Sequence, residues 1–134
     1  GKANTDLYGN EINHYLGKYA PTKSCCHLFA SLGQLRYTSI LRHLYCMIGN
    51  SSSGIYETGY WKLPTINVGD RQKGRFTTAN IINVGTSYSE IKNAFNYMDT
   101  DNYREKMKMI VNPYGDGKAS ERIVKYIKKY FYEV

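Results

Sequence analysis

The 134-residue sequence lacks several features that would assign a protein to a class at once. It has no apolar run near the roughly 20 residues that a membrane-spanning helix needs, and no signal peptide is visible. It has only three cysteines, Cys25, Cys26 and Cys46, and neither they nor the histidines have the spacing of a metal site. We therefore predict a protein that binds neither membrane nor metal and keeps its cysteines as small apolar side chains in the reducing cytoplasm.

The sequence has fewer acidic than basic residues. It has 11 aspartates and glutamates against 18 lysines and arginines, which gives a formal charge of +7. Such a balance, together with 14 tyrosines, could attract nucleic acid and stack on its bases. The lysines, however, concentrate in 103–109 and 125–130, opposite apolar residues at helical spacing, which is typical of a solvated helix face. We predict no nucleic-acid partner, since a nucleotide diphosphate needs only one or two local cations.

Segments with the apolar spacing of helices alternate along the chain with short apolar runs typical of strands. The sequence has no internal repeat and no interior linker. Helical spacing predicts helices over 6–20, 34–44, 55–61, 103–111 and from 119 onward, and Ser87 with Glu90 forms a capping box that opens another helix. Short apolar runs predict strands over 27–31, 45–48, 63–69 and 80–84. Strands and helices that alternate through short loops favour one α/β domain with a parallel sheet. In helix 34–44 the residues expected to be buried are Leu35, Thr38, Ile40, Leu41 and Leu44.

The stretch 50–75, NSSSGIYETGYWKLPTINVGDRQKGR, carries the clearest functional pattern. A strand delivers the small residues 50–54 to the start of a helix, where free N–H groups, hydroxyls and the positive dipole end favour an anion. Glu57 follows one turn later, with a carboxylate suited to ribose hydroxyls, and the basic loop 70–75 ends the next strand. Both loops lie at the carboxyl ends of neighbouring parallel strands, where such sheets bind ligands. The pattern predicts a nucleotide site, although serine and glycine also cap helices that bind nothing.

The same residues resemble the hydrolysing UDP-N-acetylglucosamine 2-epimerases. The resemblance rests on NSSSGIYE followed by LPTINVGDRQKGR, and it extends to KANTD at 2–6, SLGQLRY at 31–37 and NPYGDGKASERIV at 112–124. It covers almost the whole chain. It implies a Rossmann-like parallel sheet with helices on both faces, the C-terminal half of a GT-B fold.

The resemblance also implies a set of UDP-binding residues. Asn4 would lie near the diphosphate, and the backbone of 31–33, including Leu32, would receive the uracil. Glu57 would bind the ribose hydroxyls and Arg71 the phosphate side, whereas Arg75 could be either a ligand or a surface residue. The serine turn would hold the diphosphate through Ser51, Ser52, Ser53 and Gly54.

Family chemistry is the elimination of UDP from UDP-N-acetylglucosamine to a glycal, followed by addition of water to give N-acetylmannosamine, a precursor of sialic acid. The resemblance implies no cofactor. Because the acidic residues for this chemistry lie in an N-terminal domain, residues 1–134 are expected to be a partial UDP-binding domain without catalytic residues, inactive alone, with UDP or a UDP-N-acetylhexosamine as ligand. The alternative is a non-catalytic basic module that binds a nucleotide or another protein.

In the family the first strand of this domain lies between the strands expected at 27–31 and 45–48. Without it, two strand edges would have to pair with each other, with a second copy, or with water. The sequence therefore predicts either a rearranged strand order or a strand-sharing dimer. We also expect a homo-oligomer.

Overall fold

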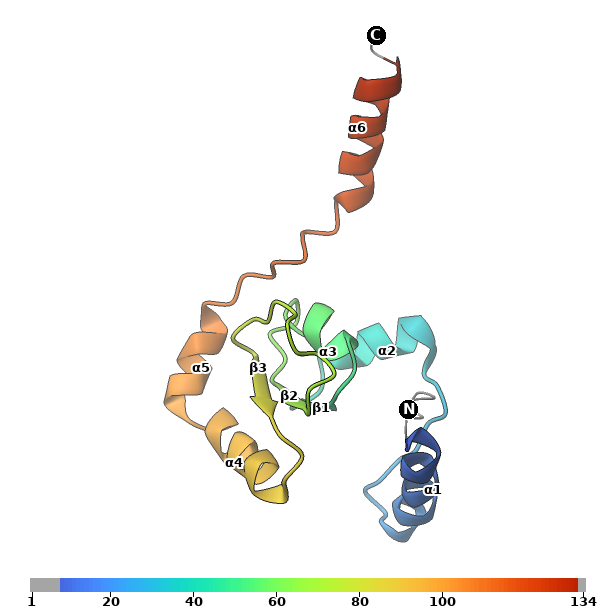
Figure 1. Ribbon diagram of the computed structural model, residues 1–134, viewed down its shortest axis with the longest axis vertical. Coiled ribbons are helices and arrows are strands. Elements are labelled where there is room, and N and C mark those ends of the chain that lie inside the picture. The colour runs from blue at the N-terminus through green and yellow to red at the C-terminus, as the bar shows by residue number, and fades with distance from the viewer. Residues whose placement is uncertain (1–7, 133–134) are drawn as a thin grey trace. The chain divides into compact units, whose positions relative to one another are not determined.

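The computed structural model describes residues 8–132 (Figure 1). Residues Gly1–Ile40 and Leu41–Val134 form two compact units. The prediction for Asn4 lies outside the described residues. Across 8–132, no helix combines the length and the apolar composition that crossing a membrane would require.

The first unit is helical. Helix α1 covers Gly9–Tyr19, a 3-10 turn η1 covers Ala20–Thr22, and α2 begins at Gly33 and ends at Leu41. Pro21 lies in the first turn of η1, where its missing N–H group costs nothing, so the α-helix ends there as predicted.

The strand predicted over 27–31 is wrong. This segment has no regular secondary structure, and Leu28 and Phe29 are about half exposed, at 48% and 52%. A short apolar run becomes a strand only where a neighbouring strand completes its hydrogen-bond ladder. Within residues 8–132 the only sheet is made of later strands, so this segment has no such ladder.

The predicted buried side of α2 is also wrong in most positions. Leu41 is buried, but Leu35 is 80% exposed, Ile40 and Leu44 are exposed as well, and the helix ends three residues earlier than expected. The Thr38 hydroxyl donates to the carbonyls of Gln34 and Leu35. Helical spacing shows which residues share a face, but not whether another element covers that face.

The second unit is built on three parallel strands in the order β1-β2-β3. Strand β1 is Met47–Gly49, β2 is Thr65–Val68 and β3 is Ile81–Val84, with Ile48 opposite Ile66 and Ile66 opposite Ile82. The parallel α/β architecture is confirmed. Because residues 27–31 form no strand, they do not pair with β1, which contradicts the rearranged strand order. The homo-oligomer and the strand-sharing dimer stay predictions.

Helices lie on both faces of this sheet. They are α3 (Ser53–Tyr56), α4 (Tyr88–Met98) and α5 (Asp101–Lys108), whereas residues 119–131 of the last helix, α6 (Ala119–Tyr132), are all exposed. Figure 1 shows α4 beside β3, and on this face Ile66 packs with Ala94, Met98 and Tyr103 in the core. On the other face α3 approaches closely: a Cβ atom on Gly54 would lie 3.1 Å from Cγ2 of Thr65. A side chain at position 54 would be a tight contact, so α3 packs closely on the sheet at Gly54.

The capping box that opens α4 is confirmed. The backbone N–H of Glu90 donates to Oγ of Ser87, and the Glu90 carboxylate accepts from the backbone of Ser87. The predicted apolar face is present as well, because Ala94 and Met98 are buried and Phe95 packs against them. In α6 the apolar residues share a stripe but are exposed, among them Ile123, Val124 and Ile127.

A buried polar network anchors the start of β3. Asn80 is fully buried, and its Nδ2 donates to Oγ1 of Thr58 and to the carbonyl of Leu63, both at 2.9 Å. Its main-chain carbonyl accepts from the hydroxyl of Tyr103 at 2.8 Å, and its side-chain Oδ1 accepts from the hydroxyl of Thr78. Thr58, Leu63 and Thr78 therefore meet at the Asn80 carboxamide and Tyr103 at its main-chain carbonyl, which fixes β3 relative to β2.

Candidate nucleotide-binding site

The serine turn follows β1, as predicted, but its helix is much shorter than the expected 55–61. Helix α3 covers only Ser53–Tyr56. The Thr58 hydroxyl donates to the Gly54 carbonyl at 2.7 Å, the acceptor that the next helical N–H would use, so the hydroxyl competes with continuation of the helix. A single turn has a weak dipole, so anion binding here depends on individual N–H groups and hydroxyls.

The serines and Glu57 are joined by hydrogen bonds. Oγ of Ser53 donates to Oε2 of Glu57 at 2.8 Å, and the backbone N–H of Ser53 donates to Oγ of Ser51 at 3.3 Å. Ser51 and Glu57 are exposed, Ser52 is half-buried and Gly54 is buried. In this arrangement Ser53 orients the Glu57 carboxylate, a role that the sequence pattern did not indicate.

The basic loop after β2 is tied directly to the serine turn. Nε2 of Gln72 donates to the Asn50 carbonyl at 2.6 Å, and NH1 of Arg71 donates to the same carbonyl at 3.2 Å. Gln72 is only 3% exposed. The two loops that the sequence singled out therefore meet at one oxygen atom, and Arg71 lies at the serine turn. Its role on the phosphate side stays a prediction.

Arg75, which the sequence left undecided, lies over an aromatic ring of α3. Its guanidinium carbon is 5.3 Å from the ring centre of Tyr56, a favourable cation–π distance. Tyr56 also packs edge-to-face on Tyr114 at 4.7 Å between ring centres, and the Tyr114 hydroxyl donates to the Phe76 carbonyl at 2.7 Å. Arg75 therefore packs on α3 through Tyr56, and its role as a ligand-binding residue stays undecided.

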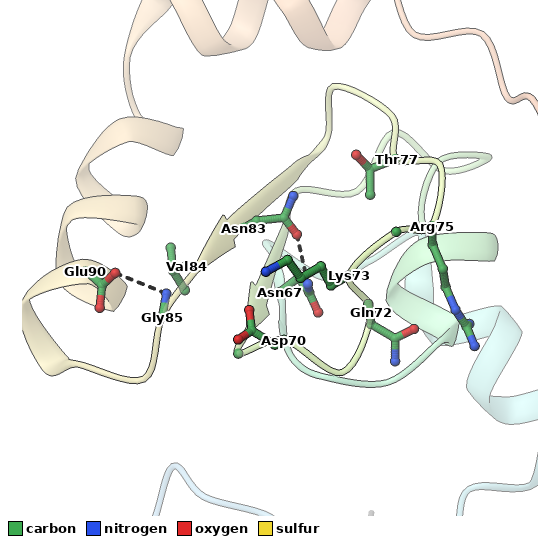
Figure 2. A pocket seen from close by; sticks show the side chains of 12 residues that line it. Asn67, Asp70, Gln72, Lys73, Arg75, Thr77, Asn83, Val84, Gly85 and Glu90 are labelled. Atoms are coloured by element: carbon green, nitrogen blue, oxygen red, sulfur yellow. Dashed lines mark hydrogen bonds between the residues drawn. The ribbon is translucent and has the colours of Figure 1, made fainter.

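A pocket of about 410 Å³ opens at the carboxyl ends of β2 and β3. Figure 2 shows Asn67 and Asn83 joined across the two strands, where Nδ2 of Asn67 donates to Oδ1 of Asn83 at 2.8 Å. Oε1 of Glu90 accepts from the Gly85 N–H at 3.2 Å at one side of the pocket. Hydrogen bonds from the Ser87 hydroxyl and from the backbone of Gly85 and Ser87 lower the pKa of Glu90. The remaining lining residues are Gly69, Asp70, Gln72, Lys73, Gly74, Arg75, Thr77 and Val84.

The expected uracil-binding residues belong to the first unit. Leu32 is half-buried, and Oγ of Ser31 accepts from the Gly33 N–H at 3.1 Å. The roles assigned to Asn4 and Leu32 stay predictions. In the described part of the chain no three histidine, cysteine or acidic residues are grouped closely enough to hold a metal ion.

Three carboxamides near the site were missed by sequence reasoning: Asn67, Gln72 and Asn83. Two of them alternate with apolar residues at matching positions of neighbouring strands, TINV and IINV. Both strands end at the predicted site, and each has an asparagine at the same position of its motif. This repetition could have indicated Asn67 and Asn83. Gln72 carries no such signal, since its burial depends on the path of the loop.

A parallel sheet whose strands β1 and β2 end in a serine-rich turn and a basic loop belongs to the α/β class of domain, in which ligands bind at that edge of the sheet. The sequence matches the family described as UDP-N-acetylglucosamine 2-epimerase over residues 2–128, and the chain belongs to that family.

Named relatives agree with this assignment. The chain is 41% identical over 105 residues to the GDP/UDP-N,N'-diacetylbacillosamine 2-epimerase (hydrolyzing) of Campylobacter jejuni, which covers 78% of the chain and 27% of that protein. It is 34% identical over 122 residues to the polysialic acid biosynthesis protein P7 of Escherichia coli, covering 91% of the chain and 31% of that protein. The chain thus spans about a third or less of the relatives it matches.

A solved structure supports the fold. A crystal structure of a Listeria monocytogenes protein described as a UDP-N-acetylglucosamine 2-epimerase superposes with a TM-score of 0.71 at 23% identity. The match covers 99% of this chain and 36% of that one. At this identity the likeness shows the fold, which is that of part of a GT-B protein.

Proposed function

We propose that this chain is the UDP-binding part of a hydrolysing UDP-N-acetylglucosamine 2-epimerase. The observation that carries the proposal is the junction of the two loops at Asn50, where Gln72 and Arg71 donate to one carbonyl. This junction places the Arg71 guanidinium at the hydroxyl-rich turn that holds Ser51, Ser52 and Ser53. Cation, hydroxyls and backbone N–H groups together suit a diphosphate.

Glu57 completes the nucleotide half of the proposal. Its carboxylate is exposed and oriented by Ser53 at one end, which leaves further lone pairs for the two hydroxyls of a ribose. The whole protein would eliminate UDP from UDP-N-acetylglucosamine and hydrate the resulting glycal, releasing N-acetylmannosamine for sialic-acid-type synthesis. We expect the 134-residue chain alone to bind UDP without catalysing this conversion.

Calorimetric titration of the chain with UDP tests the proposal. We expect saturable binding that Arg71→Ala weakens by about tenfold or more, because a charge-assisted contact to phosphate is lost. Arg71→Lys should have an intermediate effect, since it keeps the charge but loses the planar fork. Arg104→Ala is the matched control, because Arg104 is an exposed arginine on α5 whose nearest carboxylate, Asp99, lies 3.8 Å away.

Each outcome has a defined meaning. Binding that survives unchanged in Arg71→Ala would remove Arg71 from the site while keeping the nucleotide. No binding at millimolar UDP would contradict the proposal that this chain forms the nucleotide half-site. Release of N-acetylmannosamine from UDP-N-acetylglucosamine by the chain alone, followed by NMR, would contradict the expected lack of activity.

A further inference from the structure

Cys25 and Cys26 form an accessible pair of thiols in the first unit. Cys25 is exposed, Cys26 is half-buried, and both are free. The backbone N–H of Cys26 donates to the Lys23 carbonyl at 3.0 Å, so the two cysteines lie in a tight turn directly after η1. This placement differs from the expectation that the cysteines serve as small apolar side chains, because an apolar role would require both of them to be covered.

The two side chains of this pair interact with each other. A hydrogen bond joins the thiol of Cys26 to the side chain of Cys25. Partial burial raises the pKa of the Cys26 thiol, the hydrogen bond with Cys25 raises it further, and the charge of Lys23 lowers it. Cys26 therefore keeps its proton near pH 7, and the exposed sulfur of Cys25 is the one that a reagent reaches first.

A direct disulfide fits this pair poorly. Adjacent Cα atoms across a trans peptide bond are about 3.8 Å apart, whereas the Cα atoms of most disulfides are about 4.4–6.8 Å apart. A single atom placed between the two sulfurs avoids this mismatch, since each sulfur then bonds to that atom and not to the other sulfur. The pair is thus better suited to holding a bridging centre than to oxidation.

The available ligands select the kind of centre. Thiolates favour a soft, thiophilic element. Zinc sites need three or four protein ligands, and within residues 8–132 no three histidine, cysteine or acidic side chains are grouped closely enough to hold a metal ion. A two-coordinate copper(I) ion requires its sulfurs on opposite sides. Trivalent arsenic is pyramidal and accepts two sulfurs that lie side by side, as these do.

We propose that Cys25 and Cys26 form a vicinal dithiol site that captures trivalent arsenicals carrying two hydroxyl groups. The Cys25 sulfur bonds to arsenic as one As–O bond breaks, and the Cys26 sulfur bonds as the second As–O bond breaks. Each thiol proton leaves with one hydroxyl group as water. Arsenic stays trivalent throughout, so the step needs no oxidant or reductant. The site does not depend on the proposed nucleotide function.

Intact-mass spectrometry of the reduced chain, titrated with phenylarsonous acid, tests this site. Thiol counting first establishes that all three cysteines of the sequence are reduced. We expect one phenylarsenic group per chain, bound with the loss of two water molecules. The adduct should survive an excess of the monothiol glutathione, and dithiothreitol should remove it, because only another dithiol competes with two linked As–S bonds.

Single substitutions separate the pair from the remaining cysteine. Cys25→Ser and Cys26→Ser should each weaken binding of the arsenical by about a hundredfold or more, because the second As–S bond is no longer formed within one molecule. Cys46→Ser is the matched control, since Cys46 is half-buried like Cys26 but lies 20 residues further along the chain. It should change the affinity by less than about twofold. Circular dichroism checks that each variant folds like the parent chain.

X-ray absorption at arsenic provides an independent readout, in which the proposal requires two sulfur neighbours and one carbon. A single sulfur neighbour, or an adduct that glutathione removes, would overturn the dithiol site. Full binding in either Cys25→Ser or Cys26→Ser would do the same. Loss of binding in Cys46→Ser would place one of the As–S bonds on the wrong cysteine, and the absence of any adduct on the fully reduced chain would also contradict the proposal.

Discussion

The carbonyl oxygen of Asn50 lies 2.6 Å from Nε2 of Gln72, across 22 residues of sequence. This bond joins the loop after β1 to the loop after β2 and determines how far apart the serine turn and Arg71 lie. The geometry of the proposed UDP site therefore depends on a glutamine that contacts no nucleotide group itself. Gln72 is a positioning residue for the phosphate site.

Gln72→Glu tests whether the hydrogen bond to Asn50 matters, because it keeps a polar side chain of the same size at this position but removes the donor. A carboxylate cannot donate to the Asn50 carbonyl and would face it as a second acceptor, so the free energy of unfolding should fall by about 1–3 kcal/mol. Urea unfolding followed by circular dichroism measures this change. Gln34→Glu in α2 is the control, since Gln34 is exposed and should change stability by less than about 0.5 kcal/mol. Equal effects at both positions would contradict the role of the bond.

Asn80→Leu should be the most destabilising substitution among these. It leaves the Thr58 hydroxyl and the Leu63 carbonyl without the donor that they share in a fully buried position. We expect a loss of about 2–4 kcal/mol, measured as a shift of the urea midpoint with unchanged slope. Asn96→Leu provides an exposed comparison on α4. A midpoint within error of the parent chain would show that the network does not stabilise β3.

Tyr103→Phe removes only the hydroxyl that donates to the Asn80 carbonyl at 2.8 Å. The ring stays in the core, so the expected loss is about 1 kcal/mol, the net value of one hydrogen bond. Burial raises the pKa of Tyr103, so absorbance titration should show this hydroxyl ionising above the exposed tyrosines. Tyr88→Phe, at a ring that is 79% exposed, should leave stability unchanged. If Tyr103 ionises together with the exposed tyrosines, its hydroxyl is not held as described.

Glu90 should make stability depend on pH. Its pKa in the folded chain is lowered by the Ser87 hydroxyl and the Gly85 and Ser87 N–H groups from an ordinary value of 4.5. The stabilising contribution is thus fully present above pH 4.5 and is lost as the pH falls through the lower folded value. Comparison of the parent chain with Glu90→Gln at pH 7 and at pH 3 checks this. The difference in urea midpoint should shrink at pH 3, and a constant difference would contradict it.

Asp116 should titrate at an unusually low pH. The Arg122 guanidinium donates to both carboxylate oxygens, at 2.9 and 2.7 Å, and the Lys118 N–H also donates to Oδ1. These contacts lower the pKa of Asp116 to about 2, so the local structure before α6 should persist until the pH falls toward that value. Carboxyl ¹³C shifts followed by NMR give the pKa directly. In Arg122→Gln the Asp116 pKa should rise toward 3.8, and no rise would show that the pair does not hold in solution.

Much of the second unit followed from local sequence patterns. The strands around Ile48, Ile66 and Ile82, the Ser87 capping box and the apolar face of α4 depend on residues close in sequence, and each was predicted within a few positions. The proposed nucleotide loops could also be located from the sequence. Loops that follow neighbouring parallel strands lie at the same edge of the sheet, so the small residues and cations in them are brought together by the parallel order alone. These features are determined by periodicity, capping and turn chemistry, which are properties of short segments.

Tertiary structure decided the rest. Residues 27–31 form no strand, because an apolar run also needs a neighbouring strand to complete its hydrogen bonds. Leu35 is exposed, because helical spacing does not determine whether another element covers that face. Tertiary structure also shortened α3 through the Thr58 hydroxyl, and it buried Gln72 between two loops. Hydrogen bonds and burial between residues far apart in sequence depend on the path of the whole chain, so only the folded structure shows them.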